Sequence, residues 1–301
     1  MKKSRRILAT ILFFIGVGCM FAAAVVFFKH SLEDEFAEMA VENVRPDSET
    51  VATIEGLPVE TQLPGTAPEE AVTPQPIPVP EATATPTPEP TSTPEPTPTP
   101  IINPYAESYL ANKDMAGWLV IPGTNIDYPV MWTPEDENYY LYKDFEGRKN
   151  SNGSLILDTD SCLDPLTTNL IIHGHNMKSG AMFGNLTDYE DPDYYKEHKN
   201  IILYTEECQR NYEVIAVFRS QVFRKKDMVF KFYKFFQADT EDEFNDFYEN
   251  IKDISIYDTG VTAEFDDHFI TLSTCVYHVE NGRFVVVAKE VESGDTYLPV
   301  E

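Results

Sequence analysis

The chain has 301 residues, of which 50 are Asp or Glu and 23 are Lys or Arg, so its formal net charge is −27. A chain this acidic, with no basic stripe beyond its first six residues, cannot neutralise many phosphates, and we expect no nucleic-acid partner. Four scattered cysteines do not make a disulfide scaffold, and whether Cys162 and Cys208 pair stays open.

Residues 1–30 have the pattern of a membrane anchor. Four basic residues among the first six precede an uncharged apolar run from Ile7 to Phe28. About 20 such residues span the hydrocarbon core of a bilayer as a helix. A cleaved signal peptide is the alternative, but its apolar region reaches only about 15 residues. We therefore expect a single-pass protein of the cell membrane, with a cytoplasmic N-terminus and all that follows Lys29 outside.

Residues 31–104 are predicted to form a disordered extracellular linker. Sixteen of the 22 prolines fall between Pro46 and Pro104, interleaved with Thr, Glu and Ser. Such a sequence cannot bury a core and favours extended polyproline geometry of about 3 Å per residue. The linker would hold the following domain away from the membrane.

Residues 105–301 have the pattern of one folded domain. A helix is predicted over 105–115. Eight short apolar runs, bounded by Gly, Pro, Asn or Asp, are predicted as strands: 118–121, 128–131, 154–157, 169–172, 201–204, 212–218, 269–273 and 284–288. Two more helices are predicted, over 180–198 and over 240–252, where aromatic residues follow i, i+3, i+4 spacing. The predicted fold is mainly β with helices, a closed antiparallel or mixed barrel.

Reactive side chains follow two of the predicted strands. The run 170–172 leads into His173, Gly174 and His175, Cys275 comes directly after 270–274, and Arg283 begins the next strand eight residues later. A thiolate attacks carbonyl carbons, an imidazole moves protons, and a guanidinium offers aligned donors to an oxyanion. Each residue alone is usually structural. Together, at one rim of a barrel, they favour a catalytic site.

A zinc site is the alternative use of the histidines. His173 and His175 alternate along an extended segment and would bind zinc together with His278 or Cys275. Gly174 permits a turn between them, and no Asp or Glu lies near them in the sequence. We therefore expect no metal, and thiol chemistry requires no cofactor.

Three motifs resemble those of the sortases, the membrane-anchored cysteine transpeptidases of Gram-positive bacteria. They are Gly-His-Asn-Met-Lys at 174–178, Thr-Leu-Ser-Thr-Cys at 271–275 and Gly-Arg-Phe-Val-Val at 282–286. The block 117–130 and the predicted helix over 240–252 resemble class B in particular. Class B members that carry an acidic residue just after the cysteine differ from this chain, which has Val276 and Tyr277 there.

The resemblance implies an eight-stranded sortase-type β-barrel with His175, Cys275 and Arg283 as the catalytic group. It also implies that the substrate groove is lined by Ser273, Thr274, Asn138, Leu141 and Tyr233. The implied partners are secreted proteins bearing a C-terminal sorting signal and the amine of a peptidoglycan precursor or pilin.

The implied reaction is attack of Cys275 on the carbonyl after Thr in the sorting motif, followed by transfer of the acyl group to the amine. An L,D-transpeptidase is an alternative with His, Cys and Arg in the same order. Its cysteine normally follows Ser-His-Gly, however, whereas Ser273 and Thr274 precede Cys275 here. A non-catalytic surface-binding module is the second alternative.

Overall fold

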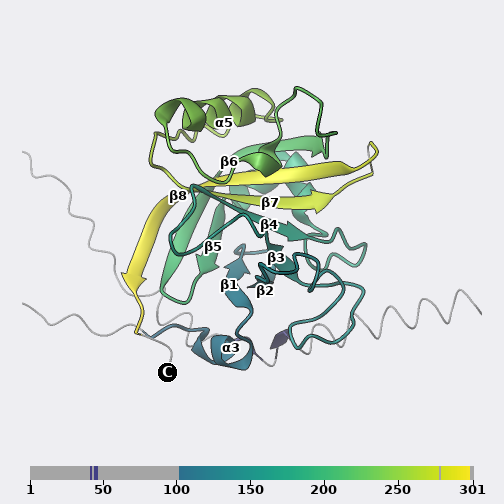
Figure 1. Cartoon of the computed structure of the whole chain (residues 1–301), viewed down its shortest axis with the longest axis vertical. Helices are drawn as coiled ribbons and strands as arrows, with labels where there is room; N and C mark the ends of the chain where they lie inside the picture. The colour runs from purple at the N-terminus through teal and green to yellow at the C-terminus, as the bar shows by residue number, and fades with distance from the viewer. Residues whose placement is uncertain (1–40, 43, 47–101, 278, 299–301) are drawn as a thin grey trace, which may run out of the picture.

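The computed structural model describes residues 41–42, 44–46, 102–277 and 279–298 (Figure 1). The strands are β1 (Met115–Val120), β2 (Asp127–Met131), β3 (Leu155–Leu157), β4 (Asn169–Gly174), β5 (Asn200–Tyr204), β6 (Cys208–Gln221), β7 (Phe269–Cys275) and β8 (Gly282–Thr296). The helices are α3 (Ala106–Ala111), η1 (Leu186–Glu190), α4 (Pro192–Glu197), η2 (Phe232–Lys234) and α5 (Glu241–Asp253).

The eight strands close into a barrel in the order β1-β2-β3-β4-β7-β8-β6-β5. The pairs β2–β3 and β4–β7 are parallel, and the other pairs are antiparallel. Each predicted strand overlaps an observed one, so the prediction of a closed, mainly β barrel is confirmed. Strands β6 and β8 extend well beyond the predicted runs, because only their centres are continuously apolar.

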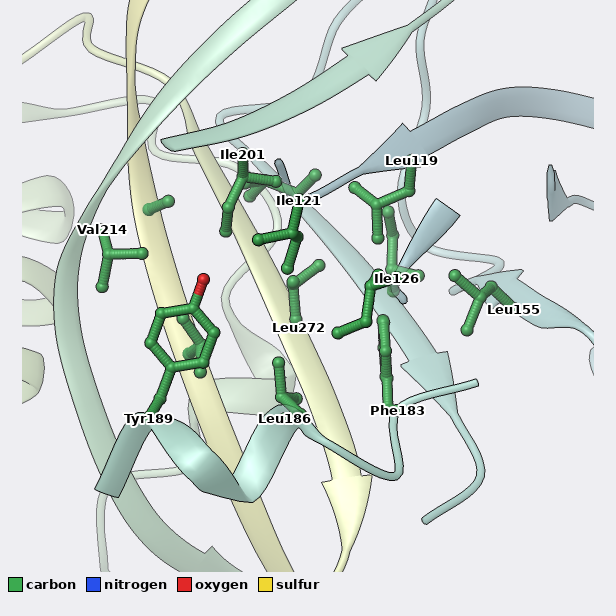
Figure 2. Packing of buried hydrophobic residues seen from close by; sticks show 14 of the residues in the cluster. Leu119, Ile121, Ile126, Leu155, Phe183, Leu186, Tyr189, Ile201, Val214 and Leu272 are labelled. Carbon is green, nitrogen blue, oxygen red and sulfur yellow. The ribbon is translucent and has the colours of Figure 1, made fainter. Parts of the chain in front are cut away.

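The interior of the barrel is filled by large aliphatic and aromatic side chains. Leu119, Leu155, Val214 and Leu272 point inward from four different strands, and Phe183 closes the interior from the segment after β4 (Figure 2). All five side chains are fully buried. Burying such side chains contributes roughly 1.5–3 kcal/mol each, so the interior is the main source of stability.

Helix α5 covers the outer face of β6, β7 and β8 (Figure 1). It begins with a capping box, in which Thr240 accepts from the backbone N–H of Glu243 and the Glu243 side chain accepts from the backbone N–H of Thr240. The predicted aromatic stripe is buried, and Phe247 stacks on Phe235 with ring centroids 4.0 Å apart. The prediction of a core-facing helix over 240–252 is confirmed.

The other two predicted helices are shorter than expected. The first ends at Ala111, and Met115 already belongs to β1. The segment 180–198 contains the 3₁₀ helix η1 and the helix α4 instead of one continuous helix. The break lies at Asp191 and Pro192, because the residue before proline avoids helical geometry. Asp191 is extended, and its side chain caps α4 by accepting from the N–H of Asp193.

The predicted membrane helix and most of the predicted linker lie outside the described residues. Within the part of the chain that is described, no helix has the length and apolar character needed to cross a membrane. A short piece of the predicted linker is described and packs on the barrel. Val41 is 6% exposed, and the Nε atom of Arg45 lies 3.2 Å from a carboxylate oxygen of Asp127.

Candidate active site

The ends of β4 and β7 bring the sequence-predicted residues together on the outer face of the barrel. These strands are parallel neighbours, with His173 opposite Ser273 and Gly174 opposite Thr274. Strand β8 runs antiparallel to β7 and places Arg283 opposite Cys275. The predicted hairpin between Cys275 and Arg283 is therefore present, and the three strands form the floor of one groove.

The groove contains a pocket of about 350 Å³. Its lining includes nearly all of the predicted catalytic and substrate-binding residues: His175, Cys275, Arg283, Ser273, Thr274, Asn138 and Leu141. Tyr233 does not line this pocket. It lies in η2, where its hydroxyl accepts a hydrogen bond from the backbone N–H of Phe223 at 2.9 Å.

His175 is oriented by the segment between β2 and β3. Its Nε2 atom lies 2.8 Å from the carbonyl oxygen of Leu141. A carbonyl oxygen only accepts, so Nε2 carries the proton and Nδ1 is the ring nitrogen left for proton transfer. The ring of Tyr142 lies beside the imidazole, with centroids 5.4 Å apart.

Gly174 lets the histidine segment pack tightly against the barrel. A Cβ atom at this position would lie 2.6 Å from side-chain atoms of both Leu155 and Phe183, closer than carbon atoms approach. Any larger residue would therefore displace the segment that carries His175. Gly174, which in the sequence permitted a turn between His173 and His175, therefore allows close packing of this segment in the structure.

Two hydrogen bonds join the histidine segment to the cysteine strand. The Nδ2 atom of Asn176 donates to the carbonyl oxygen of Cys275 at 2.9 Å. The hydroxyl of Thr274 donates to the carbonyl oxygen of Gly174 at 2.8 Å. The residues next to His175 and Cys275 are therefore tied to each other, which limits relative movement of the two side chains.

Arg283 lies at the open end of the groove and is partly buried. Its Nη1 atom donates to the carbonyl oxygen of Gly282 at 3.1 Å. The turn before it contains Asn281 with φ of 57°, a left-handed conformation that asparagine tolerates. Both Arg283 and Cys275 line the pocket.

Ser273 and Thr274 are almost fully buried beneath the groove, at 2% and 1% exposed. The Ser273 hydroxyl has no hydrogen-bond partner within the described residues. A buried hydroxyl without a partner costs free energy, about 1–3 kcal/mol. Because Ser273 lines the pocket, a rotation of its side chain would present the hydroxyl to a group that enters there.

Sequence reasoning missed two acidic residues of the site. The Oδ2 atom of Asp158 lies 3.0 Å from Nε2 of His173, within hydrogen-bond distance. Glu137 lies close to both side chains. Burial raises the pKa of Asp158, but hydrogen bonds from His173 and from the backbone N–H of Asp160 outweigh it, so the pKa is lowered. Neither acid is near His173 in the sequence, so no local signal could have revealed the cluster.

Among the described residues, the thiols outside the groove form no disulfide. Cys162 and Cys208, whose pairing the sequence left open, are both free, as is Cys275. Cys208 is buried at the start of β6, whereas Cys162 is partly exposed between β3 and β4. Cys275 differs from both in lying beside an imidazole-bearing segment and an arginine in a pocket.

A cysteine, a histidine and an arginine in one groove of a closed mixed barrel define a thiol-dependent acyl-transfer enzyme. Residues 119–291 match the sortase domain family. The chain is 36% identical over 186 residues to sortase B of Listeria monocytogenes, covering 60% of this chain and 71% of that protein. It is 30% identical over 185 residues to sortase B of Staphylococcus aureus, covering 60% and 72%.

Solved structures give the same result. A Staphylococcus aureus sortase B–substrate complex superposes with a TM-score of 0.56 at 29% identity, covering 64% of this chain and 86% of that one. Sortase B of Clostridium perfringens superposes with a TM-score of 0.56 at 26% identity, covering 62% and 98%. The chain belongs to the sortase family and is a sortase B-type cysteine transpeptidase.

Proposed function

We propose that Cys275, His175 and Arg283 carry out the acyl transfer. The observation that supports this proposal best is that the three residues line one pocket at the ends of β4, β7 and β8. The Cys275 thiolate attacks the carbonyl carbon of the scissile peptide bond. The proton that the Cys275 thiol loses on becoming a thiolate passes to Nδ1 of His175, which then gives it to the departing amine. The guanidinium of Arg283 stabilises the oxyanion formed by the attack with two aligned donors.

The second half of the reaction reverses these roles. The thioacyl enzyme is attacked by a second amine, and His175 takes the proton that this amine loses. Collapse of the second oxyanion breaks the bond between carbon and the Cys275 sulfur and releases the joined product. Nδ1 is the atom that moves the proton in both halves, because Nε2–H is donated to Leu141.

The acyl donors in this proposal are secreted proteins bearing a C-terminal sorting signal. The acceptor is the amine of a peptidoglycan precursor or of a pilin. Similarity to sortase B crystallised as a complex with its substrate supports a peptide ligand in this groove. Family membership argues against an L,D-transpeptidase, and retention of all three reactive residues argues against a non-catalytic surface-binding module.

The proposal also places the enzyme at the outer face of the cell membrane. Residues 7–28 would anchor it with the N-terminus in the cytoplasm, and the proline-rich stretch before the barrel would act as a spacer. Protease added to intact protoplasts should then digest the C-terminal domain and leave an N-terminal fragment in the membrane fraction. A domain protected until the membrane is broken would contradict this orientation.

Alanine substitutions test the assignment of roles. Cys275→Ala, His175→Ala and Arg283→Ala should each abolish or nearly abolish cleavage of a sorting peptide, with little change in Tm because these side chains contribute little to the core. His198→Ala is the control, since its Nδ1 contacts the carbonyl of Pro122 away from the pocket. If His175→Ala were active, the proton-transfer role would be wrong.

A further inference from the structure

A cluster of three metal-ligating side chains lies beside the proposed catalytic residues, and two of the three, Glu137 and His173, line the same pocket as Cys275. Glu137 comes from the segment between β2 and β3, Asp158 directly follows β3, and His173 lies on β4. One potential ligand atom of each residue lies within 4.8 Å of the other two. We call these three residues the acid–histidine cluster.

Asp158 is held in place by the surrounding backbone, and it in turn orients His173. The Oδ1 atom of Asp158 accepts from the N–H of Asp160 at 3.1 Å, and the N–H of Asp158 donates to the carbonyl oxygen of Ile171 at 2.8 Å. The other carboxylate oxygen, Oδ2, lies 3.0 Å from Nε2 of His173. The carboxylate and the imidazole are therefore already directed at each other.

The spacing of these atoms suits a small divalent cation. Tetrahedral zinc with ligands at about 2.0–2.1 Å places neighbouring donor atoms about 3.3 Å apart. The 3.0 Å separation between Asp158 Oδ2 and His173 Nε2 needs to open by only a few tenths of an ångström. Glu137 is exposed, so its longer side chain can adjust to complete the set. Three protein ligands then leave one coordination position open.

The buried hydroxyl of Ser273 is a second, independent indication of a ligand. Ser273 lies opposite His173 in the β4–β7 register, is 2% exposed and lines the same pocket. Its Oγ atom has no hydrogen-bond partner among the described residues. Once this hydroxyl rotates toward the pocket, a water molecule in the open coordination position of a cation would provide the missing partner.

We propose that the acid–histidine cluster binds a divalent first-row transition metal, best fitted by Zn²⁺, with the Ser273 hydroxyl bonded to the metal's water. One imidazole with two carboxylates is a donor set for such metals. Calcium is a poorer fit, because it takes six to eight oxygen ligands. The positive charge of Lys234 also interacts with Asp158. The two negative charges of Glu137 and Asp158 exceed this single positive charge, so the cluster still attracts a cation.

The cation would lie close to the reacting groups. His173 precedes His175, and Ser273 precedes Cys275, by two residues each on neighbouring strands, a step of about 7 Å along each strand. The metal would therefore lie on the floor of the groove beside the thiol. If the proposed function is correct, the metal and the acyl-donor peptide would share this groove.

Zinc titration of the full chain carrying Cys275→Ala tests the proposal without a contribution from the groove thiol. Calorimetry should show one Zn²⁺ bound per chain. His173→Gln and Glu137→Gln should each raise Kd at least about tenfold. His268→Gln, at the opposite end of β7, is the matched control and should leave Kd within about twofold. Both ligand positions are exposed enough for the variants to fold, which circular dichroism verifies.

Several outcomes would overturn the proposal. They are no binding by the Cys275→Ala chain, a Kd unaffected by His173→Gln, and tighter binding of Ca²⁺ than of Zn²⁺. Cobalt added to the unsubstituted chain should give an absorption spectrum without a thiolate charge-transfer band, and a band that is lost in Cys275→Ala would assign the metal to Cys275 instead. None of these measurements requires turnover, so their outcome is independent of the proposed acyl transfer.

Discussion

Replacing Asn176 by Ala removes a side-chain hydrogen bond that ties the histidine segment to the cysteine strand. Its Nδ2 atom donates to the carbonyl oxygen of Cys275 at 2.9 Å. A neutral hydrogen bond of this kind contributes about 0.5–1.5 kcal/mol net. For a domain of this size the loss lowers Tm by about 1–6 °C, so the variant stays folded at assay temperature.

The loss of this hydrogen bond should lower activity more than the loss of a similar hydrogen bond far from the groove. If the loss is expressed in the transition state, kcat/KM falls by about twofold to tenfold, since about 1.4 kcal/mol corresponds to a factor of ten. The decrease should lie mainly in kcat, because Asn176 positions the reacting groups rather than the peptide. The assay is steady-state cleavage of a fluorogenic sorting peptide by each folded variant.

Asn250→Ala provides the matched control. Its Nδ2 atom donates to the carbonyl oxygen of Asp246 at 2.6 Å on the exposed side of α5, away from the groove. This variant loses the same kind of bond and should keep kcat/KM unchanged. The reasoning would be refuted if Asn176→Ala lowered Tm as expected but retained the kcat/KM of the unsubstituted enzyme.

Three further predictions follow from the site and the packing. Arg283→Lys keeps the charge but loses the aligned donors, and should reduce kcat about 10²-fold to 10³-fold; near-normal turnover would remove the oxyanion role. A chain that starts at residue 47 loses the contacts of Val41 and Arg45, and should lose about 3–8 °C in Tm while keeping its kcat/KM; an inactive protein would contradict the spacer role. Burial, followed by the carboxylate of Asp114, raises the pKa of Tyr140 to about 12. Its contribution to stability is therefore complete below pH about 10 and lost as pH rises through about 12; Tyr140→Phe should flatten this loss in urea unfolding, and identical curves would contradict it.

The reactive residues were predictable because strand ends leave a local signal. The strands predicted over 169–172 and 269–273 indicated that His175 and Cys275 lie just beyond buried β segments, and the parallel pairing of β4 and β7 then brings them together. The eight-residue spacing to Arg283 predicted the hairpin that places it opposite Cys275. Local patterns were sufficient because each residue is positioned by its own strand.

Features that depend on distant contacts were not predictable in this way. Glu137 and Asp158 meet His173 only because the barrel closes β3 against β4, and neither acid has a local motif. Tyr233 was expected in the groove wall, and it is not among the residues that line the pocket around Cys275. The break at Pro192 did have a local signal in the residue pair at 191–192, which the apolar spacing of the surrounding segment obscured.

The most direct test of the central claim is the detection of the thioacyl enzyme. Mass spectrometry of the protein quenched during turnover of a sorting peptide should show the mass of the N-terminal peptide fragment added to the chain. Proteolysis should place the addition on Cys275, an added amine should remove it and yield the joined product, and Cys275→Ala should show none. Cleavage by Cys275→Ala, or an adduct on Cys162 in place of Cys275, would contradict the claim.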